Sequence, residues 1–118
     1  MPLKSYMETT SKVDDKFLFI GGLHIYFGKS GTLDAEFPVK LGYVHLISEN
    51  GELVLKNVER RDKDSCTFYQ DGKAGGVGLN IPKGVAKSPN FPLKQYDTVV
   101  IKTDYDSKRV SLIKKRKL

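Results

Sequence analysis

The sequence predicts an all-β protein: a small compact barrel or sandwich of about seven or eight strands, with one short helix near residues 82–87. Two observations predict this fold. Short runs in which apolar and polar residues alternate recur along most of the chain, and Gly, Asn, Asp and Pro separate them. Only residues 82–87 offer a helix start, with Pro82 in the first turn, and Gly84 and Pro89 keep that helix short.

Size and composition indicate a single domain over residues 1–118. A chain of 118 residues buries about 60–70% of its unfolded surface, which suffices for a core without disulfide or metal staples. No apolar run approaches the roughly twenty residues of a membrane helix, so we expect no membrane partner. Residues 1–16 lack the apolar stretch of a secretory signal. A subdivision into a neutral β part, residues 16–74, and a basic part, residues 75–118, is compatible with this core.

The few cysteines and histidines predict no cofactor and no metal site. Cys66 is the only cysteine, so no intrachain disulfide can form, and we expect a reducing, cytoplasmic setting. Its place in an alternating run indicates a half-buried structural residue. His24 and His45 are the only histidines, and each is expected on a sheet surface. Two histidines without clustered carboxylates do not make a catalytic metal site.

The first strands are predicted on either side of a glycine pair. Residues 16–20 (KFLFI) and 23–27 (LHIYF) flank Gly21-Gly22 and read as a hairpin or as one sharply bent strand. A further short run, residues 36–40, contains Pro38, which has no backbone N–H to donate. That run is therefore expected at a sheet edge or at the start of a strand.

Residues 43–58 carry the strongest local signal in the chain. Asn50-Gly51 supplies two residues that accept positive φ, as a type I′ turn requires, between YVHLIS and ELVLKNV. This turn places Ile47 opposite Val54 and Leu46 opposite Leu55, so that apolar pairs fall on both faces. The hairpin is therefore expected in the middle of the sheet. Glu49 opposite Glu52 is a small unfavourable pairing of like charges.

The second half of the chain predicts a further strand and a terminal hairpin. A charged connector precedes the strand, and a glycine-rich junction follows it. These elements are expected at residues 59–64 (connector), 66–70 (strand), 75–78 (junction), 79–81 (strand end) and 98–102 with 109–113 (hairpin around residues 103–108).

No catalytic motif is found, and we expect a protein that is not an enzyme. Gly28-Lys29-Ser30 resembles the end of a phosphate-binding P-loop, in which successive backbone N–H groups converge on the phosphates. The motif needs glycine at position 23, which is Leu23, and no helix pattern follows Ser30. Gly75-Gly76-Val77-Gly78 likewise opens no dinucleotide-binding unit, since strands and helices do not alternate.

Positive charge is concentrated in the last third of the chain. Residues 75–118 hold ten Lys and Arg against three acids, whereas residues 1–74 hold ten against eleven. Such asymmetry indicates a polyanionic partner, whose phosphates the basic side chains would neutralise. The candidate phosphate contacts are Lys83, Lys87, Lys94, Lys102, Lys108, Arg109, Lys114, Lys115, Arg116 and Lys117.

Residues 78–117 also resemble a known family. The order Ile81-Pro82, short helix, Tyr96-Asp97 turn, then a hairpin that closes in basic residues is similar to the swapped-hairpin DNA-binding fold of the AbrB/SpoVT type. That family usually has Gly-Asp where this chain has Tyr96-Asp97, and Gly-Arg where it has Val77-Gly78. The resemblance implies DNA binding, a role in transcription regulation and a homodimer.

Two functions remain open at this point. The first is a nucleic-acid-binding protein, with DNA more expected than RNA, whose basic third contacts phosphates. The second is a protein-interaction module, in which the neutral β part binds a partner and the basic tail serves solubility or docking. A continuous basic face in the folded protein would favour the first.

Overall fold

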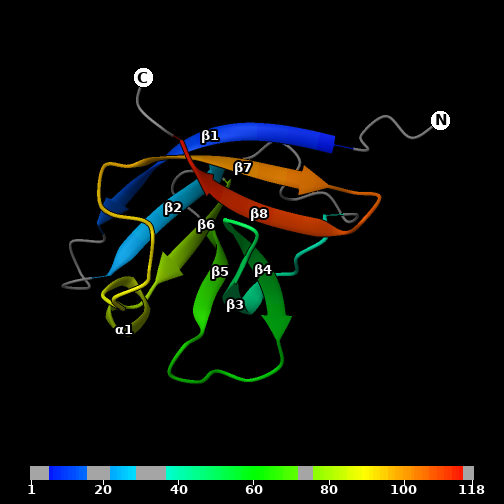
Figure 1. The fold of residues 1–118 in the computed structure, drawn as a ribbon. Coiled ribbons are helices and arrows are strands. Elements are labelled where there is room, and N and C mark those ends of the chain that lie inside the picture. The colour runs from blue at the N-terminus through cyan, green and yellow to red at the C-terminus, as the bar shows by residue number, and fades with distance from the viewer. Residues whose placement is uncertain (1–5, 16–21, 29–36, 72–75, 116–118) are drawn as a thin grey trace.

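In the computed structural model, eight antiparallel strands close a barrel in the order β1-β2-β6-β5-β3-β4-β8-β7 (Figure 1). The structure describes residues 6–15, 22–28, 37–71 and 76–115. The elements are β1 (Tyr6–Asp15), β2 (Leu23–Gly28), β3 (Gly42–Glu49), β4 (Glu52–Val58), β5 (Cys66–Asp71), β6 (Gly76–Ile81), α1 (Lys83–Ala86), β7 (Thr98–Asp104) and β8 (Arg109–Lys114). The predicted all-β barrel with one short helix is confirmed within these residues.

The β3–β4 hairpin forms in the predicted register. Asn50 and Gly51 have φ values of 51° and 81°, and Ile47 pairs with Val54. Val54 is 1% exposed while Ile47 is 40% exposed. The hairpin is thus buried on both faces along β4, but β3 leaves one apolar side chain at the surface.

The terminal hairpin also forms, and it closes the barrel. Ile101 of β7 pairs with Leu112 of β8, and Leu112 pairs in turn with Leu53 of β4. On its other side, β7 pairs with β1, where Thr98 lies opposite Lys12. Both outer edges of the hairpin are therefore paired within one chain. The homodimer stays a prediction, but its expected cause, a hairpin that needs a second chain, is absent from the described barrel.

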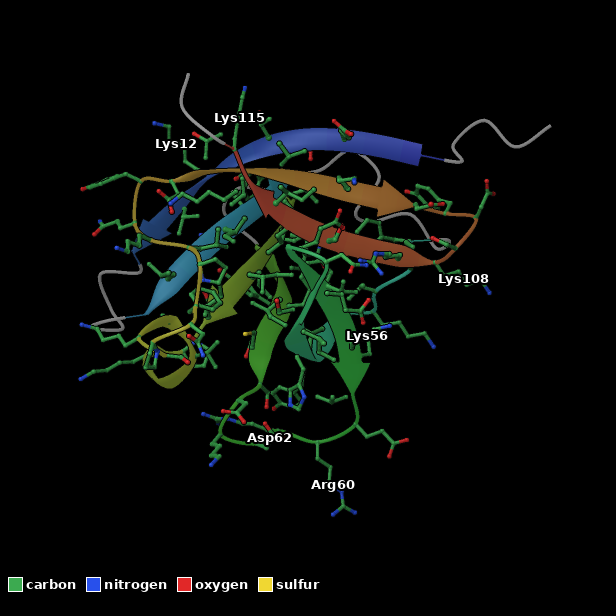
Figure 2. The ribbon with its side chains drawn as sticks, in the orientation of Figure 1. Lys12, Lys56, Arg60, Asp62, Lys108 and Lys115 are labelled. Atoms are coloured by element: carbon green, nitrogen blue, oxygen red, sulfur yellow. The ribbon has the colours of Figure 1, made fainter. Side chains whose placement is uncertain are left out.

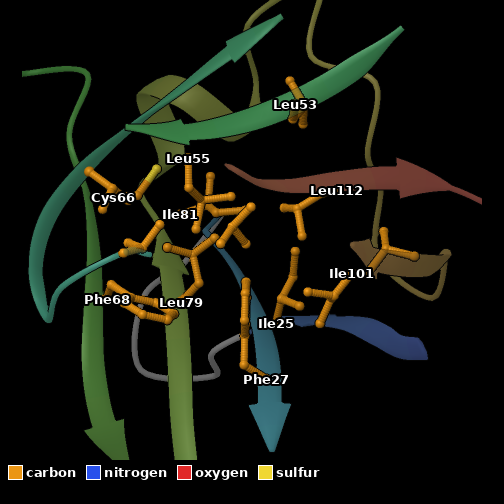
Figure 3. Packing of buried hydrophobic residues seen from close by; sticks show 14 of the residues in the cluster. Ile25, Phe27, Leu53, Leu55, Cys66, Phe68, Leu79, Ile81, Ile101 and Leu112 are labelled. Atoms are coloured by element: carbon orange, nitrogen blue, oxygen red, sulfur yellow. The ribbon is translucent and has the colours of Figure 1, made fainter. Parts of the chain in front are cut away.

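The core fills the barrel with side chains from alternate positions on the strands (Figure 3). Ile25, Phe68 and Leu79 are at most 1% exposed, and the Phe27 ring meets the Phe68 ring edge-on with centroids 5.0 Å apart. Cys66 is wholly buried among them, beyond the half-burial expected, and this burial raises the pKa of its thiol to about 12. A thiol in this state packs as a small apolar group.

The glycine-rich junction predicted at residues 75–78 is wrong from Gly76 onward, because β6 begins there. Gly78 lies under a hydrogen bond between the Tyr69 hydroxyl and His24 Nε2, which are 3.0 Å apart. A Cβ at residue 78 would stand 2.6 Å from His24 Nε2 and 3.2 Å from the Tyr69 ring. The glycine therefore provides room for this pair, and His24 is buried rather than on the sheet surface.

Three other predictions differ from the structure or lie outside it. The expected strand at residues 36–40 is wrong where described, since residues 37–41 form no strand; the Asn57 amide instead donates to the Lys40 carbonyl at 2.9 Å. Pro82 is the N-cap residue of α1 rather than its first helical residue. Residues 16–20 lie outside the described residues.

Candidate nucleic-acid interface

The predicted cations fall into separate groups. The first group lies at the β7–β8 turn, where Lys102 and Arg109 pair with glutamates. Arg109 Nη1 lies 2.8 Å from Glu49 Oε1, and Arg109 Nη2 lies 3.4 Å from Glu52 Oε1. Lys102 Nζ lies 3.2 Å from the other oxygen of Glu52. The cross-strand pair of glutamates, unfavourable alone, is thus bridged by Arg109, and Lys102 adds a second cation beside Glu52. We call Glu49, Glu52, Lys102, Lys108 and Arg109 the turn end.

Electrostatics at the turn end favour the ionised form of Glu52. A hydrogen bond from Ser111 lowers the pKa of Glu52 most, and Lys102 and Arg109 lower it further, whereas burial acts in the opposite direction. Lys108, in the turn itself, is exposed, but it follows Asp104 and Asp106 closely in the chain. The turn end therefore offers a polyanion little uncompensated positive charge.

The second group lies at the opposite end of the same hairpin, where strand pairing and a turn bring the backbones of four lysines close together. Lys12 lies opposite Thr98 across β1 and β7, and the Lys115 N–H donates to the Thr98 carbonyl at 2.8 Å on the other side. Lys114 pairs with Val99, and Lys94 begins the turn that leads into β7. All four lysines are exposed. Figure 2 shows Lys12 and Lys115 near one another and far from Lys108.

Asp97 forms an ion pair with one of these lysines, Lys114. Asp97 Oδ2 lies 3.5 Å from Lys114 Nζ and accepts a hydrogen bond of 2.8 Å from the Lys94 backbone N–H. The Asp97 side chain is only 20% exposed, so it fixes the turn more than it shields the surface. Lys12, Lys94 and Lys115 form no ion pair with any residue in the described part of the chain.

An exposed tyrosine lies in the same turn as Lys94. Tyr96 is 71% exposed and has a φ of 75°. It is the third residue of a turn that the Asp97 N–H closes by donating to the Lys94 carbonyl at 3.1 Å, a position that in type II turns favours glycine. The Tyr96 N–H donates to the Val13 carbonyl at 2.7 Å, which ties the turn to β1. We call Lys12, Lys94, Tyr96, Lys114 and Lys115 the lysine end.

The remaining predicted contacts lie elsewhere. Lys83 and Lys87 are exposed on and just after α1, where the Lys87 N–H donates to the Lys83 carbonyl at 2.9 Å. Figure 1 shows the connection from α1 to β7 running along the side of the barrel. The α1 lysines are thus separated from the lysine end by that connection. Arg116 and Lys117 lie outside the described residues.

Sequence reasoning missed two members of the lysine end, Lys12 and Tyr96. Lys12 lies in the neutral part of the chain, and only the β1–β7 pairing brings it to Thr98. The sequence predicts a turn at Tyr96-Asp97, but the positive φ of Tyr96 and the exposure of its side chain appear only in the structure.

Neither a metal centre nor a membrane span appears among the described residues. No group of three or more His, Cys, Asp and Glu in the described ranges is placed to hold a metal ion. No helix there is long and apolar enough to cross a membrane.

Comparisons with protein-family models, with curated protein sequences and with solved structures find no match to this chain. Functional inference therefore starts from the side chains themselves. What they define is a closed antiparallel β-barrel with exposed lysines and an exposed tyrosine at one end of the β7–β8 hairpin.

Proposed function

We propose that this protein binds nucleic acid at the lysine end, with the lysines on phosphates and the Tyr96 ring stacked on a base. The observation that carries the proposal is an exposed tyrosine with positive φ, in a turn close to Lys12, Lys94 and Lys115, which form no ion pair with any residue in the described part of the chain. Phosphate neutralisation releases condensed counterions, and an aromatic ring stacks on a base with about 1–3 kcal/mol per base. Surfaces that bind single strands usually combine cationic side chains with exposed aromatic rings.

The geometry of Tyr96 supports single strands over duplex. A base in a duplex already stacks on its neighbours and must be unstacked, at a cost, before it can cover the ring. A single strand meets no such cost. The backbone conformation of Tyr96 also costs about 1–2 kcal/mol relative to an ordinary one. The hydrogen bond from the Tyr96 N–H to the Val13 carbonyl helps to hold this conformation and leaves the ring at the surface, where a base can reach it.

Replacing Tyr96 tests the proposal, since strain and stacking predict opposite changes. Tyr96→Asn removes the ring and accepts positive φ, so the melting temperature should stay equal or rise. Affinity for a twelve-residue oligothymidylate should fall about 5- to 150-fold, which corresponds to 1–3 kcal/mol. Tyr96→Phe keeps the ring and should bind nearly as tightly as the natural chain. Fluorescence anisotropy at low salt measures all three proteins.

Two results would contradict the proposal. One is an absence of binding to any oligonucleotide at about 50 mM salt, where phosphate contacts are strong. The other is equal affinity of the asparagine and phenylalanine variants, which would leave the ring without a role.

The choice of DNA over RNA and a role in transcription regulation rest on the resemblance of residues 78–117 alone. Comparing the oligothymidylate with the matching oligouridylate tests the first. The predicted homodimer is tested by the molecular mass in solution, and the cytoplasmic setting stays a prediction.

The protein-interaction module remains the second candidate, because two apolar side chains lie open on the β3 side. Leu41 and Ile47 are 49% and 40% exposed. Ile47 also lines a groove with Leu46 and Phe91. Failure of the nucleic-acid test together with loss of a partner in an Ile47→Asp variant would favour this candidate.

A further inference from the structure

A second surface, away from the lysine end, has the form of a small-ligand site. A pocket of about 560 Å³ opens where β6 ends and α1 begins. This volume lies within the range of about 300–1,000 Å³ found for small-molecule and cofactor sites. Its apolar walls come from Leu23, Ile81 and Pro82. A ligand that packs against these walls therefore needs an apolar face.

A row of outward-facing polar side chains forms the floor of the pocket. Tyr43, Thr67 and Asn80 lie opposite one another on three neighbouring strands, β3, β5 and β6. Tyr43 contributes an aromatic face that is partly covered. The ladder of strand pairing fixes the spacing of this row, so its side chains are held in place before any ligand arrives.

Asn80 supplies the specific signal. Its Oδ1 is buried and has no hydrogen-bond donor among the residues that the structure describes. Buried acceptors are nearly always satisfied, so this one calls for a partner. The Asn80 amide lines the pocket and therefore has hydrogen-bonding capacity that no described residue uses. An amide offers an acceptor beside a donor, which complements the amino group and N7 of adenine.

Two cations stand at the rim of the same pocket. Arg61, from the loop between β4 and β5, and Lys83, at the start of α1, both line it and are exposed. Neither forms an ion pair with a residue in the described ranges. The loop that carries Arg61 is held by Asp62, whose carboxylate lies 2.9 Å from His45 Nε2 and accepts from the Asp64 N–H at 2.9 Å. Two cations without a described ion pair, one of them on a loop held by hydrogen bonds, can bind a phosphate.

We infer that this pocket binds one purine nucleotide, with the adenine base over the Tyr43–Thr67–Asn80 row and the phosphate between Arg61 and Lys83. The ligand is either a free nucleotide or an unstacked nucleotide of a bound strand, since both present the same base and phosphate. The inference uses none of the residues of the lysine end and can fail or succeed without it.

Calorimetric titration of the full chain with four probes tests the inference: adenosine 5′-monophosphate, adenosine, inorganic phosphate, and purine riboside 5′-monophosphate, which lacks the amino group. The adenine nucleotide should bind one to one, and at least about tenfold more tightly than the analogue without the amino group. Adenosine and inorganic phosphate should each bind more weakly than the whole nucleotide.

Variants assign the contacts. Asn80→Leu should bring the adenine nucleotide and its analogue to equal affinity, and it should not lower the melting temperature, because Oδ1 has no bond to lose. Asn80→Ser serves the same purpose if leucine perturbs folding. Arg61→Gln with Lys83→Gln should remove the advantage of the nucleotide over adenosine. Lys56→Gln with Lys108→Gln is the matched control and should change neither preference.

Three outcomes would overturn the inference: no saturable binding of the nucleotide, inorganic phosphate binding as tightly as the nucleotide, or unchanged discrimination in both Asn80 variants. An oligonucleotide that ends in 5′-phosphorylated deoxyadenosine distinguishes the two sources of ligand. Titration with oligothymidylate runs in parallel. If oligothymidylate binds and depends on Tyr96 while the adenine nucleotide does not bind, this inference fails and the proposed function stands.

Discussion

The two ends of the β7–β8 hairpin carry similar numbers of cations but differ in what faces them. At the turn end, Lys102 and Arg109 lie within 3.4 Å of glutamate oxygens. At the lysine end, Asp97 pairs with Lys114, whereas Lys12, Lys94 and Lys115 form no ion pair with a residue in the described ranges. β7 spans seven residues, so roughly 20 Å separates the two ends.

This difference teaches that a charge count along the chain does not locate a binding surface. Each end contributes three cations to residues 75–118. The strands that flank the hairpin decide which cations remain available: β4 brings Glu52 against the turn end, and β1 brings Lys12 against the lysine end. The pairing partners of β7 and β8 thus convert a uniformly basic hairpin into one compensated end and one available end.

The largest expected effect comes from the core beneath both ends. Leu112 lies mid-hairpin and is 1% exposed, so Leu112→Ala should lower the free energy of unfolding by about 2–5 kcal/mol. Affinity of the folded protein for oligothymidylate should stay unchanged, because the side chain points into the barrel. Urea denaturation and anisotropy measure the two quantities. A large loss of affinity in conditions where the variant is folded would tie binding to the core instead of the surface.

A smaller effect is expected when cations at the two ends are replaced and the melting temperatures are compared. Arg109→Gln leaves Glu49 and Glu52 opposite each other without the described cation that contacts both, and should lower the melting temperature. Lys115→Gln removes a cation with no described ion pair and should leave the melting temperature unchanged. Affinity should respond in the opposite sense, falling for the Lys115 variant only. Equal effects of the two changes on either quantity would abolish the distinction between the ends.

The smallest expected effect is a dependence of stability on pH, which comes from Glu52 at the turn end. The folded pKa of Glu52 is lowered, so its stabilising contribution is fully present above the unfolded value of about 4.3. That contribution is lost as the pH falls through the folded pKa. Thermal unfolding between pH 6 and pH 3 should therefore show a smaller loss of stability in Glu52→Gln than in the natural chain. Parallel curves for both proteins would count against the assignment.

Local turn chemistry explains what the sequence predicts well. Asn50-Gly51 sets the register of the β3–β4 hairpin down to the pairing of Glu49 with Glu52, because a two-residue turn leaves one alignment. The order of strand, proline and helix around Ile81 and Pro82 also follows from local signals, and Ile81 is 1% exposed.

The candidate sites depend on contacts between distant parts of the chain, which no local pattern specifies. Arg109 meets Glu49 across 60 positions, and Lys12 reaches Thr98 only because β1 pairs with β7. The burial of His24 needs Tyr69 and the space above Gly78. Such pairs follow from barrel closure, and the sequence predicts the strands without their order around the barrel.

The dependence of binding on salt tests the central claim most directly. For a single strand, each phosphate contact contributes about −0.7 to the slope of log K against log salt, so four lysines predict about −2.8. Lys94→Gln with Lys115→Gln should reduce the slope to about −1.4. Lys56→Gln with Lys108→Gln removes the same charge from exposed positions elsewhere and should keep the slope near −2.8. Equal slopes for the two double variants would show that net charge, and not the lysine end, governs binding.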